Sequence, residues 1–258
     1  LDADRMAVIT EFAQSHGLTL GSVVQAAVGL LIAERLGRDD VVYGLTVAGR
    51  PRDLENVESI LGTFINDVPV RARIDRSARL VDWLGMLQLQ HAERQPFEYL
   101  SPIEVHRCSD LPPHQPLFDL LLLMQSPGSN ASLGNGSLTL QALPGPFDSA
   151  LPMTLAVAYH GDQATLTVVY DQAVVTHDAA RSILGDLVNW LDRITQHGDQ
   201  ALGELLPAPR MPLPSTREPP TKADAPTPAG VADILLDIWR HTLGIDDIGL
   251  DDDFFALG

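Results

Sequence analysis

Residues 41–71 constrain the fold of this chain most strongly, because two extended apolar runs are separated there by a sharp turn. Residues 41–48 are rich in β-branched side chains and almost continuously apolar, which predicts a strand buried on both faces. Gly49-Arg50-Pro51 ends this run, since glycine adopts turn dihedrals and proline has no backbone donor. We expect a short helical connector next, and then a second extended segment over residues 66–74.

Periodic apolar patterns continue along most of the chain. Apolar side chains at helical spacing predict helices over residues 4–16, 22–36, 80–94 and 177–196. Gly17 and Gly37 are placed to end the first two, and Thr176 is a good N-cap for the last. Further strands are expected over residues 117–125, 151–160 and 164–170, and Asn135-Gly136 is a strong hairpin signal. This order predicts a mixed α/β layered domain through about residue 206.

Composition limits the classes of partner. Seventeen basic and 34 acidic residues give a formal net charge of -17, which would repel nucleic acid and anionic membrane surfaces. Cys108 is the single cysteine, so no internal disulfide can form, and no apolar run approaches the roughly 20 residues of a membrane span. We therefore expect a cytoplasmic protein. The chain opens on Leu1 rather than methionine, and both ends look cut from a longer polypeptide.

A change of composition marks a second region. Residues 207–230 are rich in proline, which predicts a semi-rigid extended linker. Residues 231–243 have the apolar spacing of a new amphipathic helix, followed by an acidic loop. We therefore divide the chain into residues 1–206, a linker over 207–230 and a small helical region over 231–258.

The turn and the segment after it resemble a known family. The motifs that carry the resemblance are Gly49-Arg50-Pro51 and Gly62-Thr63-Phe64-Ile65-Asn66, supported by Gln115-Pro116-Leu117-Phe118-Asp119. They resemble the C-terminal half of a condensation domain of a non-ribosomal peptide synthetase. Asp67, where threonine or serine is common, and Met124-Gln125-Ser126-Pro127 depart from the family pattern. The resemblance implies a mixed-sheet lobe of the chloramphenicol-acetyltransferase-like type.

The family's catalytic motif, His-His-x-x-x-Asp-Gly, is absent from this sequence. Eight histidines occur and no two are adjacent. In the family this motif belongs to the N-terminal lobe, where its second histidine positions or deprotonates the amine that attacks a thioester. The resemblance therefore implies that this lobe supplies one wall of a reaction tunnel and no catalytic residue, and that the chain alone does not turn over.

The resemblance also implies which residues lie at the tunnel or between the lobes: Gly49, Arg50, Pro51, Phe64 and Asn66. Arg50 could order the tunnel floor through paired hydrogen bonds, or it could simply reach solvent or a local carboxylate. Asn66 could brace a bridge between lobes, or it could satisfy backbone groups at the start of a strand. Both alternatives stay open at this point.

Three other kinds of site have little support. His106, Cys108, Asp110 and His114 match no compact ligand spacing, so we expect no metal. Gly134-Asn135-Gly136-Ser137 lacks the lysine and helix of a phosphate-binding loop. No Gly-x-Ser-x-Gly elbow is present to indicate a serine hydrolase.

The last residues resemble a second family. Asp253-Phe254-Phe255-Ala256-Leu257-Gly258 resembles the beginning of a peptidyl carrier domain. The serine that carries 4'-phosphopantetheine in that family would follow Gly258, so no attachment site lies in this chain. The implied partners are an N-terminal condensation lobe and donor and acceptor carrier domains. An adenylation enzyme would act in trans, because residues 207–230 are too few to contain one. Two alternatives are a non-catalytic carrier-docking domain and a two-lobed acyl-CoA-dependent acyltransferase.

Overall fold

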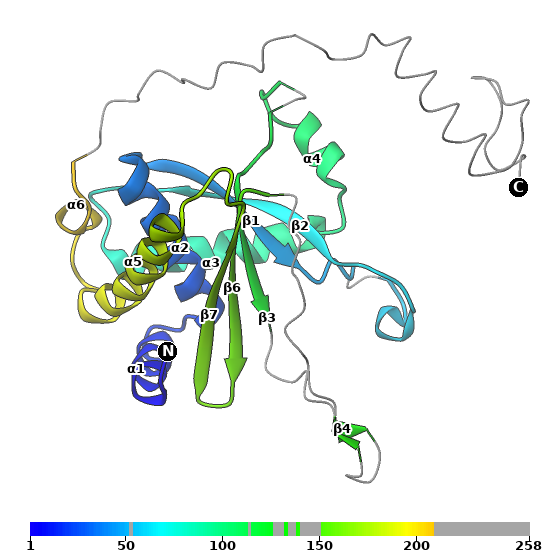
Figure 1. Ribbon diagram of the computed structural model, residues 1–258, viewed down its shortest axis with the longest axis horizontal. Coiled ribbons are helices and arrows are strands. Elements are labelled where there is room, and N and C mark those ends of the chain that lie inside the picture. Colours follow the sequence, from blue (N-terminus) through cyan, green and yellow to red (C-terminus); the bar gives the residue numbers. More distant parts are fainter. Residues whose placement is uncertain (52–53, 113–114, 126–131, 134–137, 140–150, 209–258) are drawn as a thin grey trace, which may run out of the picture. The chain divides into compact units, whose positions relative to one another are not determined.

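The computed structural model describes residues 1–51, 54–112, 115–125, 132–133, 138–139 and 151–208 (Figure 1). The chain divides into two compact units, Leu1–Pro212 and Leu213–Gly258. The predicted carrier start over residues 231–258, and all but the first two residues of the predicted linker, lie outside the described residues. The fold below is that of the first unit.

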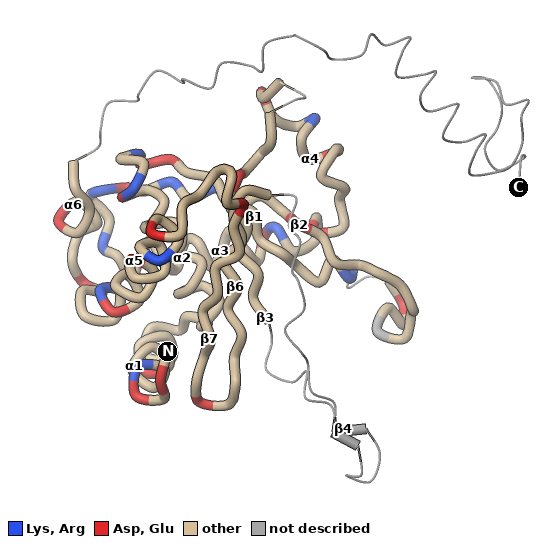
Figure 2. The backbone as a smooth tube through the Cα atoms, in the orientation of Figure 1, with Lys and Arg blue, Asp and Glu red and all other residues tan. Residues whose placement is uncertain are grey.

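A five-stranded mixed sheet forms the centre of this unit, in the order β2-β1-β3-β6-β7. Its strands are β1 (Asp40–Val47), β2 (Asn66–Arg73), β3 (Leu120–Gln125), β6 (Met153–His160) and β7 (Gln163–Tyr170). β1, β3 and β6 run parallel, whereas β2 and β7 are antiparallel edge strands. The central strands β3 and β6 carry no Lys, Arg, Asp or Glu (Figure 2). The sheet confirms the predicted α/β class.

Four long helices pack with the sheet: α1 (Ala3–Ser15), α2 (Leu20–Leu36), α3 (Leu80–Arg94) and α5 (His177–Gln196). Their bounds agree with the predictions to within two residues. Two shorter helices have no counterpart in the predictions, because α4 (Pro102–Arg107) and α6 (Leu202–Leu205) are too short for periodicity to detect. A local signal for α4 does exist. Ser101 and Glu104 form a reciprocal capping box at its start.

The turn between α1 and α2 is a tight one. Gly17 has φ +65°, and the side chain of Thr19 caps α2 by accepting from the backbone N–H of Ser22. The two helices are bent by 103° relative to each other at this break. Within the residues that the structure describes, no single helix is long and apolar enough to cross a membrane; α1 and α2 satisfy the length and composition test only as a bent pair.

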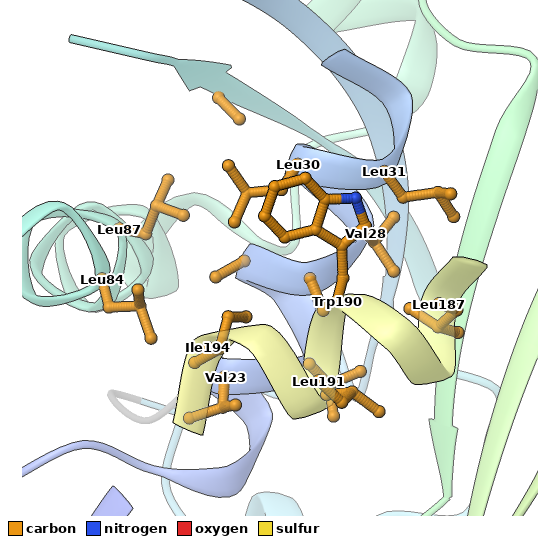
Figure 3. Packing of buried hydrophobic residues seen from close by; sticks show 14 of the residues in the cluster. Val23, Val28, Leu30, Leu31, Leu84, Leu87, Leu187, Trp190, Leu191 and Ile194 are labelled. Carbon is orange, nitrogen blue, oxygen red and sulfur yellow. The ribbon is translucent and has the colours of Figure 1, made fainter. Parts of the chain in front are cut away.

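The main core lies between the helices and one face of the sheet. α2 buries residues along almost its whole length, and α5 presents Trp190 to it (Figure 3). Trp190 is fully buried, and its indole N–H donates to Glu34 Oε2 at 2.7 Å, so the buried ring leaves no unpaired donor. Burial of one such large side chain contributes about 2–3 kcal/mol.

The opposite face of the sheet is less covered than predicted. The sequence predicts that residues 41–48 are buried on both faces, yet Val42 is 37% exposed. The alternate side chains Val41, Tyr43, Leu45 and Val47 belong to the core. On the other face, the Phe118 ring covers Gly44 so closely that a Cβ atom there would lie 2.3 Å from the ring. The Phe118 ring therefore covers part of the second face at Gly44.

A small separate sheet lies in the connection between β3 and β6. β4 (Ser132–Leu133) and β5 (Leu138–Thr139) pair antiparallel, with Leu133 opposite Leu138. The predicted hairpin around Asn135-Gly136 requires two antiparallel strands on either side of the turn, and β4 and β5 pair in this way. The turn residues 134–137 themselves lie outside the described residues.

Candidate functional site

Gly49 turns the chain out of the sheet in a way that other residues cannot easily reproduce. Its φ is +61°, in the left-handed region that favours glycine. A Cβ atom built on Gly49 would lie 1.9 Å from the backbone oxygen of Phe64. Pro51 follows in the same turn, and its carbonyl accepts from the Leu54 N–H at 3.3 Å. The first and last parts of the β1–β2 loop therefore touch at Gly49, with no room for a side chain between them.

Arg50 holds the loop between β1 and β2 in place. Its Nη1 donates to the carbonyls of Val57 at 2.5 Å and Ile60 at 3.3 Å. Its guanidinium carbon lies 4.4 Å from the centroid of the Phe64 ring, a cation–π contact. Among the described residues, no carboxylate pairs with Arg50. The side chain thus orders the β1–β2 loop through two backbone carbonyls and one aromatic ring, while its predicted role at a tunnel floor stays a prediction.

Asn66 ties the start of β2 to the segment that follows α3. Its Nδ2 donates to the carbonyls of Glu98 at 2.8 Å and Leu100 at 2.7 Å, and its Oδ1 accepts from the Asp67 N–H at 3.0 Å. Both polar atoms of the amide therefore have backbone partners. Asn66 thus satisfies backbone groups at a strand start, as in its second interpretation, and it connects the start of β2 to the segment after α3.

A partly buried charged cluster lies at the end of α3 and in the segment that follows it. Arg94 Nη2 approaches His91 Nδ1 at 2.7 Å, and Arg94 Nε lies 3.8 Å from Glu98 Oε1. Burial lowers the pKa of His91 below its ordinary value, and the nearby Arg94 cation lowers it further. The neutral imidazole can accept from Arg94, whereas an imidazolium could not. The cluster therefore favours a neutral His91.

Asp67, which departs from the family pattern, has a local partner. Its Oδ1 accepts from the Thr46 hydroxyl at 2.7 Å, and the two residues are directly opposite in the β1–β2 ladder. Cross-strand pairs of this kind stabilise a sheet by about 0.2–1 kcal/mol. The departure is thus accommodated within the sheet.

The loop that Arg50 and Asn66 hold exposes large apolar side chains. Leu61 is 99% exposed and Ile65 68% exposed, and beyond the Asn66 brace Phe97 is 57% and Tyr99 59% exposed. We call these four residues the loop surface. Clustered exposed apolar residues are typical of interaction sites. The structure brings the predicted Gly49, Arg50, Phe64 and Asn66 together directly beside this surface, through the contacts described above.

A cleft that the sequence did not indicate lies at the carboxyl-terminal ends of β3 and β6. It has a volume of about 760 Å³ and lies between α1, the start of α2 and these strand ends. Its lining includes Met6, Met124 and Tyr159 as apolar walls and Glu11 and Asp162 as acidic groups. The Tyr159 hydroxyl is buried without a hydrogen-bond partner among the described residues, and burial raises its pKa. Carboxyl ends of parallel strands are common ligand sites, but parallel pairing cannot be read from local patterns.

The residues weighed as metal ligands do not assemble into a site in the part of the chain that the structure describes. No group of three or more His, Cys, Asp or Glu side chains there is arranged to hold a metal ion. His106 Nε2 instead lies 2.8 Å from the Gln115 carbonyl, and Cys108 is exposed. His114 lies outside the described residues.

Curated relatives of this chain include proteins named as nonribosomal peptide synthetases. A linear gramicidin synthase of Brevibacillus parabrevis is 32% identical over 194 residues, 75% of this chain and 4% of the relative. Chondramide synthase of Chondromyces crocatus is 31% identical over 182 residues, 70% of this chain and 4% of the relative. The chain therefore spans only a small part of the curated relatives that it matches.

Solved condensation domains share the fold. The first condensation domain of the calcium-dependent antibiotic synthetase, in complex with a substrate analogue, matches 78% of this chain with a TM-score of 0.64 and 13% identity. The condensation domain of Monacolin K polyketide synthase matches 78% with a TM-score of 0.66 and 18% identity. The match covers 44% and 47% of those chains, respectively.

The family assignment rests on the match to a family model. The model described as Condensation domain matches residues 1–210, well over half of the 258 residues. The match includes all of the described sheet, the β1–β2 loop and the cleft. The chain therefore belongs to the condensation domain family.

Proposed function

We propose that this chain is one lobe, the C-terminal one, of a condensation domain that forms an amide bond between a carrier-bound acyl donor and a carrier-bound amine. The observation that carries the proposal is the family match over residues 1–210, combined with coverage of less than half of the solved condensation chains. A lobe that lacks paired histidines has no candidate for the family's base. The complementary lobe would therefore supply it.

The reaction requires balanced proton handling. The amine nitrogen attacks the thioester carbonyl, the C–N bond forms, the C–S bond breaks, and sulfur leaves as a thiol after the amine loses a proton. Phosphopantetheine arms on the two carriers would supply the thioester linkage and the reach. The contribution of this lobe would be to bind, orient and exclude water, since positioning alone can account for a large share of such a barrier.

The cleft is the part of this lobe that best suits a substrate. A volume of about 760 Å³ is within the usual range for small-molecule sites. Among the described residues that line it there is no Lys or Arg, and Glu11 and Asp162 would repel a phosphate. The cleft therefore fits the uncharged or amine-bearing end of a tethered substrate better than the phosphate of its arm. The apolar walls, Met6 and Met124, suit an aliphatic or aromatic group.

The loop surface is the natural contact for the complementary lobe. Its four residues leave apolar area in water that a partner would bury, while Arg50 and Asn66 keep the supporting backbone rigid. We expect Ile65→Asp to weaken association with the other lobe by at least about tenfold, because a charge would be buried at the contact. Val174→Asp is the matched control, since Val174 is 64% exposed elsewhere on the unit. If both variants bind the complementary lobe with equal affinity, the loop surface is not part of the interface.

The activity itself is tested by reconstitution. This chain, the complementary lobe of its own synthetase and two loaded carriers are combined, and the intact mass of the acceptor carrier is measured. We expect the mass of a tethered amide product only when both lobes are present. Product from this chain alone, or none from the pair with an intact double-histidine motif, would contradict the proposal.

The same experiment separates the alternatives. A carrier-docking domain would bind loaded carriers without forming product, and an acyl-CoA-dependent acyltransferase would accept acyl-CoA in place of the donor carrier.

Further proposed parts are a carrier domain beginning within residues 231–258, whose phosphopantetheine serine would follow Gly258, and an adenylation enzyme that loads it in trans. Incubating a polypeptide that continues past Gly258 with a phosphopantetheinyl transferase would reveal the carrier by its added mass.

A further inference from the structure

One wall of the cleft is formed where the start of α2 meets the end of β3. Gly21, in the first turn of α2, and Met124, near the end of β3, both line the cleft. A Cβ atom built on Gly21 would lie 3.5 Å from Met124 Cε and 3.9 Å from Met124 Sδ. These are ordinary van der Waals distances, so the space that a side chain would take at residue 21 is empty and is bounded by the Met124 methyl group.

The two methionines of the cleft differ in how firmly the core holds them. Met6, on α1, is only 8% exposed and belongs to the core, whereas Met124 is partly buried and packs against the core from outside. Methionine is unbranched and has three rotatable bonds, so it adapts to apolar groups of different shapes. Met124 is therefore the wall whose truncation would enlarge the cleft with less damage to the core.

Two carboxylates of the cleft have no cation to pair with. Glu11, on α1, and Asp162, in the turn between β6 and β7, are exposed, and neither forms an ion pair with another described residue. Their negative potential favours a cationic ligand. An α-amine, with a pKa of about 8, is mostly protonated at pH 7, whereas the acyl carbonyl of a donor thioester carries no charge.

We propose that the cleft selects the acceptor amino acid by the size of its apolar side chain, and that Gly21 and Met124 set that size. Glu11 and Asp162 attract the protonated amine of the same aminoacyl group. Each side-chain methylene that the cleft buries raises the affinity about fourfold, and methylenes beyond the Met124 methyl group add nothing. This inference rests on the proposed function, because it assigns the acceptor of that reaction to the cleft.

Amino acid amides test the proposal without any reaction. The probes are the amides of alanine, 2-aminobutyrate, norvaline, norleucine and 2-aminooctanoate, whose linear side chains lengthen along the series. Methionine methyl groups labelled with ¹³C give the readout in an NMR titration, because Met6 and Met124 line the cleft and the 60% exposed Met86 does not. We expect the signals of Met6 and Met124 to shift and that of Met86 to stay, with affinity rising about fourfold per methylene up to a limiting side-chain length.

Variants of the wall should move this limiting length. Met124→Ala removes Cγ, Sδ and Cε, so the limit should move to a longer probe, as followed by the Met6 signal. Gly21→Ala adds a methyl group to the empty space, and should lower the affinity of the longest accepted probe about fourfold. Alanine is the better helix former, so this variant should still fold. Met86→Ala is the matched control, because it makes the same truncation outside the cleft and should change nothing.

A second pair of measurements isolates the charge. Combining Glu11→Gln with Asp162→Asn should weaken binding of the amine probes about two- to fivefold, the range for solvent-exposed charge pairs. The N-acetylated probes carry no amine charge, so their affinity should be the same in this variant as in the unchanged chain. Equal weakening of both kinds of probe would overturn the assignment of the amine to these carboxylates.

The proposal is overturned if no probe shifts the Met6 and Met124 signals, if affinity does not depend on side-chain length, or if Met124→Ala leaves the limiting length unchanged. Reconstitution with the complementary lobe separates this failure from that of the proposed function. Amide product with the same acceptor preference in the unchanged chain and in Met124→Ala would refute this inference alone. Absence of product from the paired lobes would refute the proposed function, while the probe titrations would still report what the cleft binds.

Discussion

Substituting Gly49 by alanine separates backbone strain from steric overlap in the β1–β2 loop. At φ +61° an alanine costs about 1–2 kcal/mol, because its Cβ approaches the following carbonyl. The same Cβ would also lie 1.9 Å from the Phe64 oxygen, a backbone atom that cannot rotate away. Overpacking of this kind costs a further 1–3 kcal/mol, about 2–5 kcal/mol in total.

Gly161 provides the matched control. Its φ is +63°, and nothing lies within 4 Å of a Cβ built on it, so Gly161→Ala should cost the strain alone. For a domain of this size each kcal/mol lowers the melting temperature by about 2–4 °C. Thermal unfolding should therefore place Gly49→Ala several degrees below Gly161→Ala, and limited proteolysis should cut residues 54–64 faster only in the former. Equal losses and equal cleavage would refute the contact between Gly49 and Phe64.

Three further predictions concern contacts of single side chains. Asn66→Asp replaces the donor of two hydrogen bonds by an acceptor, and should reduce the free energy of unfolding by about 1–3 kcal/mol for each carbonyl left unpaired, as measured in urea. The pKa of His91 is lowered in the folded state, so the unfolded state binds more protons below about pH 6.5. The free energy of unfolding should therefore be at its full value above that pH and fall as the pH decreases. Between pH 5 and 7 this decrease in the free energy of unfolding should be smaller in His91→Gln. Gly44→Ala should cost about 1–3 kcal/mol through overlap with Phe118, and Phe118→Leu in the same chain should recover part of that loss.

Local sequence patterns were sufficient to predict a helix or strand wherever the element is long and its apolar residues are regularly spaced. α3 and α5 begin and end at the predicted residues, because each carries an apolar stripe at helical spacing and a clear terminal signal. Thr176 caps α5 through its side chain, as its position before the helix predicts. The family motifs likewise located the β1–β2 loop. All of these inferences depend on residues close together in the sequence.

The amino-acid sequence alone determined the element types, the turn at Gly49 and the family resemblance, because these depend on periodicity and on the conformational limits of single residues. Only the tertiary structure decided that Arg50 binds carbonyls, that Asn66 reaches Glu98 and Leu100, and that a cleft opens where β3 and β6 end. The Asn66 contacts and the cleft join residues far apart in the chain, and their geometry depends on strand order and on packing between helices and sheet. The physical reason is that a local pattern specifies which face of an element is apolar, while the partner of that face is selected only when the whole chain packs.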